Sequence, residues 1–125
     1  MHENELSYKI RGAAFNVHTE LGPGLFESVY EIALAHELQE EGLGVKRQLS
    51  IPIQYDGIMM DQGYRADLLV DGKVIVEVKS VEALHDVHYK QLLTYIRLAN
   101  IRLGLLMNFN SVSLKDSITR IVNDL

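Results

Sequence analysis

The spacing of the apolar residues changes partway along this chain, and that change most restricts its fold. Up to about residue 41 the apolar residues recur every three or four positions, which predicts one helix ending at Gly22-Pro23 and a second from about Gly24 to Glu41. From Val45 to Tyr55 they alternate with polar residues, which predicts a strand with one apolar face. Because Pro52 has no N–H to donate to a neighbouring strand, we expect this strand to lie at a sheet edge or to be bulged.

The remainder of the chain alternates between strand-like and helical segments. After the turn signal Asp56-Gly57, the predicted elements are a short segment, two strands, a helix, a further strand, and a tail that is either a strand or a short helix. The first five cover Ile58–Asp61, Tyr64–Val70, Lys73–Ser80, His85–Asn100 and Arg102–Phe109. A chain of 125 residues is short for two separate cores. The sequence therefore predicts one mixed α/β domain over residues 1–125.

Composition excludes several classes of protein. The chain has no cysteine, which rules out disulfides, thiolate nucleophiles and zinc–thiolate sites. Its apolar runs fall short of the ~18 residues of a membrane span, and its start lacks the pattern of a signal peptide, so we expect a cytoplasmic protein. Seventeen acidic and twelve basic residues give a net charge of −5, which counts against nucleic-acid binding.

The register of the hairpin around Asp71-Gly72 decides which residues share a face. A two-residue loop would mix apolar and charged residues on both faces. A three-residue loop, Val70-Asp71-Gly72, pairs Leu69 with Lys73. It places the apolar residues on one face and the charged residues on the other, so burial favours this register. In that register the apolar face carries Tyr64, Ala66, Leu68, Val74, Val76 and Val78.

The other face of this predicted hairpin carries Asp67, Glu77 and Lys79, with Asp67 diagonal to Glu77. Diagonal neighbours have Cβ atoms within ~8 Å, a distance that one metal ion can bridge. Magnesium prefers carboxylate oxygens, and a nearby lysine can polarise the attacking water, so the set suits hydrolysis of a phosphodiester. The alternative is an ordinary solvated strand, in which Arg65 forms a cross-strand ion pair with Glu77.

Two predicted helices add polar residues. Glu27 is in line with Leu34 and Leu38 at the edge of an apolar stripe, where it needs a partner or a wet cleft. Alternatively it is a first-turn acid favoured by the helix dipole.

The helix after the hairpin presents His88, Gln91 and Tyr95 on one face. There Gln91 is suited to orienting a water or a phosphate, and Tyr95 to holding a carboxylate or stacking. The alternative is a polar stripe beside core residues. A zinc site at His85, Asp86 and His88 is disfavoured, because the chain has neither cysteine nor a matching second histidine pair.

Together these residues resemble the PD-(D/E)XK nuclease superfamily, and most closely its GxxExxY branch. The resemblance runs from about residue 5 to the end of the chain. It rests on four motifs in the expected order, namely Gly24-Leu-Phe-Glu27-Ser-Val-Tyr30, Gly63-Tyr-Arg-Ala-Asp67-Leu-Leu-Val, Glu77-Val-Lys79-Ser and Gln91-Leu-Leu-Thr-Tyr95. No proline precedes Asp67, where the superfamily name has one.

The resemblance implies a restriction-endonuclease-like core, with a central mixed β-sheet flanked by helices. It implies a Mg²⁺ or Mn²⁺ ion held by Asp67, Glu77 and the backbone carbonyl of Val78, with Glu27 contributing directly or through water. Lys79 takes the place of the catalytic lysine. The remaining expected site residues are Gln91 and Tyr95 in catalysis, and Arg65 and His88 in substrate binding.

The expected activity is metal-dependent cleavage of DNA or RNA, with nucleic acid as the partner and a homodimer or a partner protein as a further possibility. One alternative is a catalytically silent nuclease-like domain that binds nucleic acid or a protein. Another is a structural subunit of a larger assembly. An intact set of Glu27, Asp67, Glu77, Lys79 and Gln91 favours the nuclease.

Overall fold

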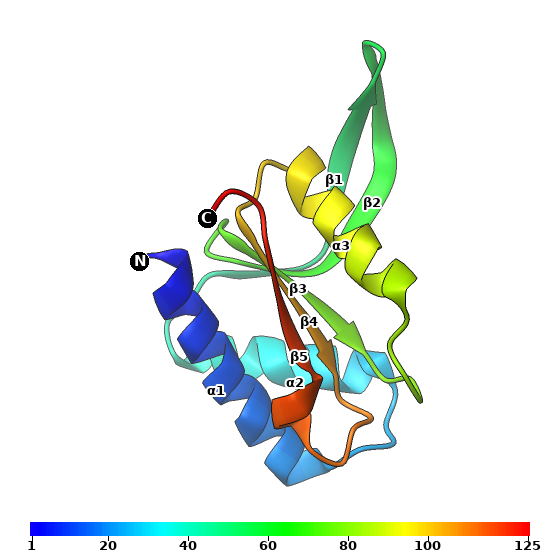
Figure 1. The fold of residues 1–125 in the computed structure, drawn as a ribbon. Helices are drawn as coiled ribbons and strands as arrows, with labels where there is room; N and C mark the ends of the chain where they lie inside the picture. The colour runs from blue at the N-terminus through cyan, green and yellow to red at the C-terminus, as the bar shows by residue number, and fades with distance from the viewer.

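The computed structural model describes residues 1–125, apart from the side chain of Gln62. Three helices and five strands follow one another along the chain, with a single 3-10 turn near the C-terminus (Figure 1). In order they are α1 (Glu3–Leu21), α2 (Glu27–Glu40), β1 (Val45–Tyr55), β2 (Ile58–Val70), β3 (Val74–Lys79), α3 (Asp86–Leu98), β4 (Leu103–Asn108), η1 (Leu114–Ser117) and β5 (Ile118–Val122).

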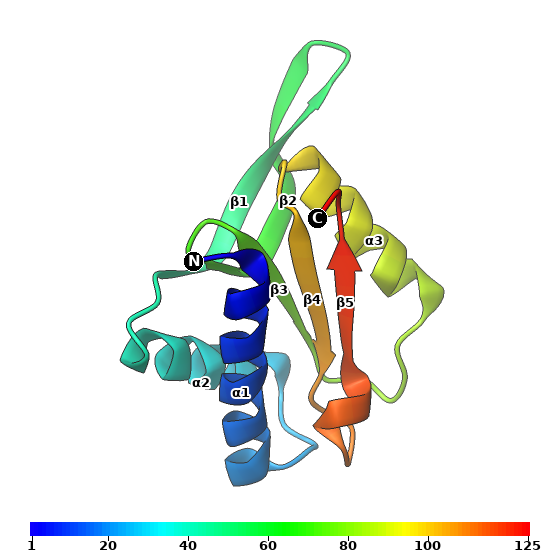
Figure 2. The same ribbon diagram turned by 60° about the vertical axis from the view of Figure 1, so that its left-hand side comes forward.

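The strands form one sheet in the order β1-β2-β3-β4-β5. The β3–β4 pair is parallel and its strands are joined through α3, whereas the other three pairs are antiparallel. Helices α1 and α2 cover one face of the sheet and α3 covers the other (Figure 2). The predicted mixed α/β fold with a central mixed sheet is therefore confirmed, and it agrees with a restriction-endonuclease-like core.

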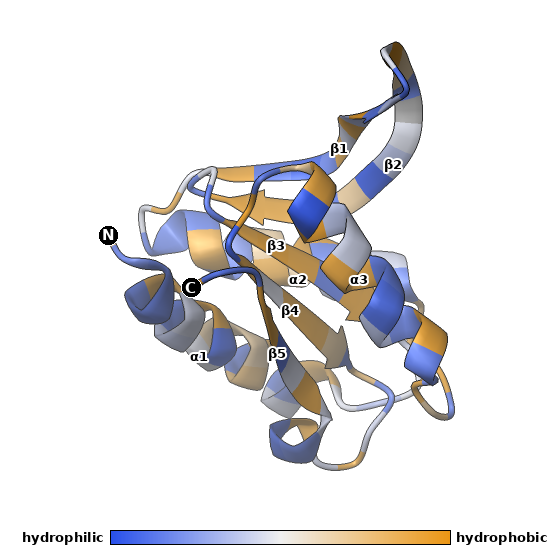
Figure 3. Cartoon of the chain, turned by 45° about the horizontal axis from the view of Figure 1, so that its top comes forward, coloured by the Kyte–Doolittle hydropathy of each residue, from blue (hydrophilic) through white to orange (hydrophobic). Residues whose placement is uncertain are grey.

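Two apolar clusters hold these layers together. The larger lies between the sheet and the α1–α2 pair and includes Ile10, Tyr30 and Phe109. The smaller lies under α3 and contains Leu92 and Ile96. The strands β3 and β4 are apolar over most of their length (Figure 3), as expected for central strands buried on both faces.

The two N-terminal helices differ in how well the sequence predicts their ends. Helix α1 ends at Leu21, and the cap residue Gly22 has a positive φ of 71°, which glycine adopts without strain. Helix α2 begins at Glu27, three residues later than predicted, because Gly24 has a φ of 97° and Phe26 is the extended N-cap residue. Phe26 therefore precedes the helix and is 82% exposed, although it is apolar.

Strand β1 lies at the edge of the sheet, and its pairing with β2 shifts between Ile51 and Ile53, on either side of Pro52. Both expectations for this proline are confirmed. The predicted segments Ile58–Asp61 and Tyr64–Val70 are one continuous strand, β2. The far ends of β1 and β2 project beyond the other strands as a two-stranded arm (Figures 1 and 2).

The β2–β3 hairpin has a three-residue loop, but the loop is Asp71-Gly72-Lys73. Val70 pairs with Val74, and Leu69 pairs with Ile75, so the predicted pairing of Leu69 with Lys73 is wrong by two residues. The observed register buries Val70 completely, whereas the predicted one leaves it in the loop. Because the shift is even, the predicted alternation of faces holds along the paired residues, which end at Leu68 and Val76.

The predicted apolar face is wrong at its far end. The pairing of β2 with β3 stops at Leu68, and β2 then continues beside β1 alone. Leu68 packs in the cluster under α1 and α2, whereas Ala66 and Tyr64 pack in the cluster under α3. Tyr64 therefore lies on the same side as Glu77, and Asp67 marks the point where the strand changes sides.

Candidate active site

Asp67 and Glu77 form the centre of the candidate site. They lie one position beyond the last β2–β3 pair, where the two strands separate. Asp67 uses Oδ2 to accept a hydrogen bond of 2.9 Å from the backbone N–H of Val78, so its side chain replaces the missing strand pairing. The backbone N–H of Asp67 is 3.5 Å from Oε1 of Glu77. Two carboxylates from neighbouring strands therefore lie close together at the point where the strands separate.

Burial makes both carboxyl groups of this pair reluctant to carry a negative charge. Burial raises the pKa of Glu77 to about 8, with the Asp67 charge as the second cause. Burial also raises the pKa of Asp67, opposed by the hydrogen bond from Val78. The positive charge of Lys79 acts in the opposite direction on both carboxyl groups. A half-buried lysine close to two carboxylates is the electrostatic arrangement expected from the Glu77-Val78-Lys79 sequence.

Two tyrosines close one side of the carboxylate pair. The Tyr64 hydroxyl donates a hydrogen bond to Oε1 of Glu77. Its ring stacks on Tyr95 of α3, with the ring centroids 3.5 Å apart. Burial and the nearby Glu77 charge raise the pKa of the Tyr64 hydroxyl, which therefore stays protonated. Tyr95 thus reaches the site through Tyr64, a residue that the sequence analysis had assigned to the opposite face.

Glu27 lies beside the site rather than within the carboxylate pair. Its Oε2 accepts a hydrogen bond of 3.1 Å from the backbone N–H of Ser80, and the Ser80 hydroxyl donates to the Leu25 carbonyl at 2.6 Å. These bonds fasten the start of α2 to the end of β3, next to Lys79. Glu27 is exposed in the first turn of α2, a placement that fits the alternative of a first-turn acid favoured by the helix dipole as well as it fits a site residue.

The other members of the Gly24-to-Tyr30 motif build the loop that carries Glu27. Gly24 provides the positive φ that the turn requires. Tyr30 is fully buried, and its ring stacks on Phe109 with centroids 4.7 Å apart. Its hydroxyl donates to the Gly22 carbonyl at 2.6 Å and accepts from the Leu25 N–H at 3.0 Å. The motif is therefore a local structure that holds the α1–α2 loop against β3.

Three expected residues lie further from the pair. Gln91 is exposed on α3, one turn before Tyr95. Arg65 is exposed and pairs with Ser50 of β1, so the two-residue shift removes it from its predicted position opposite Glu77. His88 accepts a hydrogen bond of 3.0 Å at Nδ1 from the backbone N–H of His85, and so caps the start of α3.

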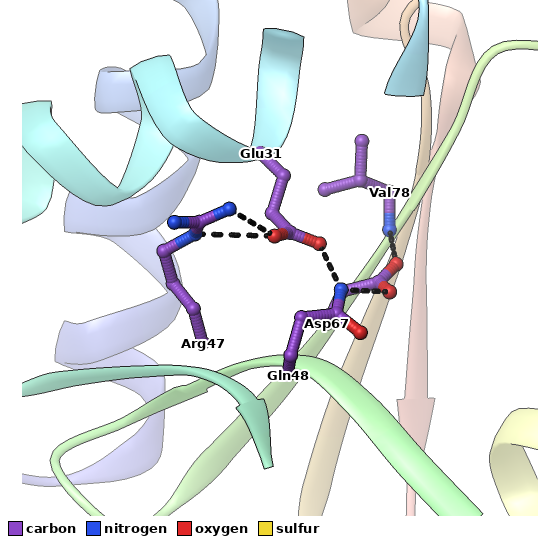
Figure 4. A network of polar contacts seen from close by, with 5 residues as sticks. All are labelled: Glu31, Arg47, Gln48, Asp67 and Val78. Carbon is purple, nitrogen blue, oxygen red and sulfur yellow. Dashed lines mark hydrogen bonds and ion pairs between the residues drawn. The ribbon is translucent and has the colours of Figure 1, made fainter. Parts of the chain in front are cut away.

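The sequence analysis missed a second polar group at this site, on α2 and β1. Glu31 is a buried carboxylate that pairs with Arg47 at 2.8 Å and accepts a hydrogen bond from Gln48 at 2.5 Å (Figure 4). The available signal was its spacing, since Glu31 lies three and seven residues before Leu34 and Leu38 and so on the buried face of α2.

Asn108 was also missed, although it is a polar residue at the end of an otherwise apolar strand. It is 6% exposed. Its side chain hydrogen-bonds both the N–H and the carbonyl of Val81, at 3.1 and 2.9 Å. Asn108 therefore fixes the chain just after Lys79 and Ser80.

The donor set at the centre of the site suits a hard divalent cation. Over residues 1–125 with Gln62 set aside, no three His, Asp or Glu side chains are grouped closely enough to hold a metal ion. Asp67 and Glu77 do offer two adjacent carboxylates, and magnesium binds proteins through one or two carboxylates while retaining several waters. A cation there would also offset the cost of burying negative charge that raises both pKa values.

Comparison with known proteins assigns the family. The family model described as PD-(D/E)XK nuclease superfamily matches residues 4–121, nearly the whole chain. No curated protein matches the chain. Within the part of the chain that the structure describes, no helix has the length and apolar character needed to cross a membrane. The carboxylate pair followed by Lys79, the mixed sheet and this match agree, and the chain belongs to the PD-(D/E)XK nuclease superfamily.

Proposed function

We propose that this protein is a Mg²⁺- or Mn²⁺-dependent nuclease that hydrolyses phosphodiester bonds in DNA or RNA. The observation that carries the proposal is the Asp67–Glu77 pair at the divergence of β2 and β3, with Lys79 two residues further along the same strand. Residues two apart on a strand project to the same side, so Lys79 and Glu77 act on the same space.

Each residue has a distinct part in this proposal. Asp67, Glu77 and the Val78 carbonyl hold the metal, which when bound lowers the pKa of a water and offsets charge on the phosphoryl oxygens. Lys79 steadies the developing charge or orients the water. Tyr95 and Tyr64 limit the motion of Glu77 by stacking and hydrogen bonding. Glu27 lies beside the end of β3, where it can reach the metal through water.

The remaining expected residues extend the proposal to substrate binding. Gln91 lies one helical turn from Tyr95, so an exposed amide there is available to a phosphate. Arg65 offers a positive charge on β2 for substrate binding. His88 offers an imidazole ring at the start of α3 for the same purpose. The loop built by Gly24 and Tyr30 supports placing the chain in the GxxExxY branch.

The first experiment tests metal binding without cleavage. The melting temperature of the parent should rise in millimolar Mg²⁺ or Mn²⁺, because binding to the native state alone stabilises it, by ~2.7 kcal/mol at a concentration of 100 Kd. Asp67→Asn should abolish this rise. Asp61→Asn, at an exposed carboxylate on the arm, should retain it. Equal rises in all three proteins would show that the metal binds elsewhere.

The second experiment tests the reaction itself. Labelled single- and double-stranded DNA and RNA are incubated with the parent over a metal titration, and cleavage should require the metal and be lost in Asp67→Asn. Metal binding without cleavage of any substrate would reject the nuclease proposal. In that case a domain that binds nucleic acid or a protein without cutting would be the better description.

A further inference from the structure

Gln48 has a backbone conformation that its side chain does not favour. Its φ is 51°, in the left-handed region, which is uncommon for residues other than glycine, asparagine and aspartate. It lies within β1, and the β1–β2 pairing passes from Arg47–Leu68 to Leu49–Ala66 without pairing Gln48. Strain of this kind persists where the surrounding structure requires it, and it is common at functional sites.

The strained backbone directs the Gln48 amide between two carboxylates. Its Nε2 lies 2.5 Å from Oε1 of Glu31 and 3.4 Å from Oδ1 of Asp67 (Figure 4). A primary amide carries two N–H donors, so one faces each carboxylate. Both neighbours of this amide are carboxylates, and two negative charges this close repel one another. The amide offsets that repulsion while keeping them apart.

Arg47 fixes the other end of this arrangement. Its Nε and a terminal guanidinium nitrogen donate to Oε2 of Glu31 at 3.1 and 2.8 Å. The Glu31 side chain is only 6% exposed, so this pairing holds a buried charge in one orientation. The ion pair already joins α2 to β1, and therefore a strained Gln48 is not needed merely to connect these elements.

We propose that Gln48 is a positioning residue for Asp67, and that Glu31 and Arg47 hold Gln48 in place. The Asp67 carboxylate is then fixed at both oxygens, by the Val78 N–H at Oδ2 and by Gln48 at Oδ1. Each oxygen keeps a lone pair for a metal. The part that concerns metal binding rests on the proposed function, whereas the orientation of Asp67 does not. Outer partners of this kind orient the ligands that contact a metal.

The test variant is Gln48→Gly, which removes the amide and relieves the backbone strain. Relief of the backbone strain and loss of the hydrogen bond to Glu31 act in opposite directions on its metal-free melting temperature, which serves only to establish that the variant folds. Its Mn²⁺ dissociation constant, measured by calorimetry, should be ~10–100-fold weaker. The matched control is Asp56→Gly, because Asp56 has a φ of 50° at the tip of the β1–β2 hairpin. The control should gain the same backbone relief and bind Mn²⁺ as the parent does.

A metal-free measurement separates this inference from the proposed function. If Gln48 orients Asp67, the Val78 amide should exchange its hydrogen ~10-fold faster in Gln48→Gly, while Val76 stays unchanged. Unchanged Val78 exchange would overturn the inference, whether or not the metal binds. If the Val78 amide exchanges faster in Gln48→Gly but the parent binds no Mn²⁺, the positioning role stands and the proposed metal site is rejected. Unchanged Mn²⁺ affinity in Gln48→Gly would overturn the link between positioning and metal binding.

Discussion

The raised pKa of Glu77 predicts that this protein becomes less stable as the pH rises. In the folded state the carboxyl group keeps its proton up to about pH 8, because it is buried beside Asp67, whereas in the unfolded chain it ionises near its ordinary value of 4.5. Between these values the folded state binds more protons than the unfolded state. The free energy of unfolding therefore decreases as the pH increases through this range.

The size of the effect follows from the same two pKa values. Each pH unit in this interval costs about 1.4 kcal/mol, so the loss between pH 5 and pH 7 is roughly 3 kcal/mol. An unfolding entropy of about 2.1 cal/mol/K per residue gives ~0.26 kcal/mol/K for a chain of this length. The melting temperature of the parent should consequently fall by about 10 °C over this interval.

The variant that checks this reasoning is Glu77→Gln, which keeps an acceptor for the Tyr64 hydroxyl but cannot ionise. Melting curves of parent and variant without metal, from pH 5 to pH 9, should diverge as the pH increases, with the variant the more stable at high pH. Glu20→Gln, at an exposed carboxylate near the end of α1, should follow the parent. Parallel curves for the parent and Glu77→Gln would refute the assigned cause, because some other group would then control the pH dependence.

Three further substitutions test separate parts of the molecule. Lys79→Ala should lower the single-turnover cleavage rate ~100-fold at saturating metal and leave Mn²⁺ affinity nearly unchanged. A cleavage rate equal to that of the parent would show that the reaction takes place elsewhere. Arg47→Met leaves the Glu31 charge buried without its partner, so the free energy of unfolding in urea should decrease by ~2 kcal/mol. Adding Glu31→Gln to this variant should restore most of that loss. No recovery in the double variant would contradict the pairing argument. Gly104→Ala places a Cβ 3.0 Å from Cγ of Leu92, so displacement of α3 should cost ~1–3 kcal/mol; an unchanged urea midpoint would show that α3 adjusts freely.

Local patterns in the sequence determined most of the elements. The end of helix α1 and both ends of strand β1 were predicted nearly to the residue, because a regular spacing of apolar residues and a clear stop signal coincide there. Pro52 predicted that β1 lies at an edge or is bulged, and the strand is both. The proximity of Asp67 and Glu77 was also predictable, since a register error of two residues still leaves them at neighbouring positions on adjacent strands.

Tertiary packing decided the rest of the site. The pairing of β2 with β3 stops at Leu68, and beyond that point Tyr64 packs in the cluster under α3 and donates to Glu77. The contact between Glu31 and Gln48 joins a helix to a strand across a bend in the backbone. Such contacts cannot be read from the spacing of residues in the sequence. Spacing indicates which face of an element a residue occupies, but it does not indicate which distant element packs against that face.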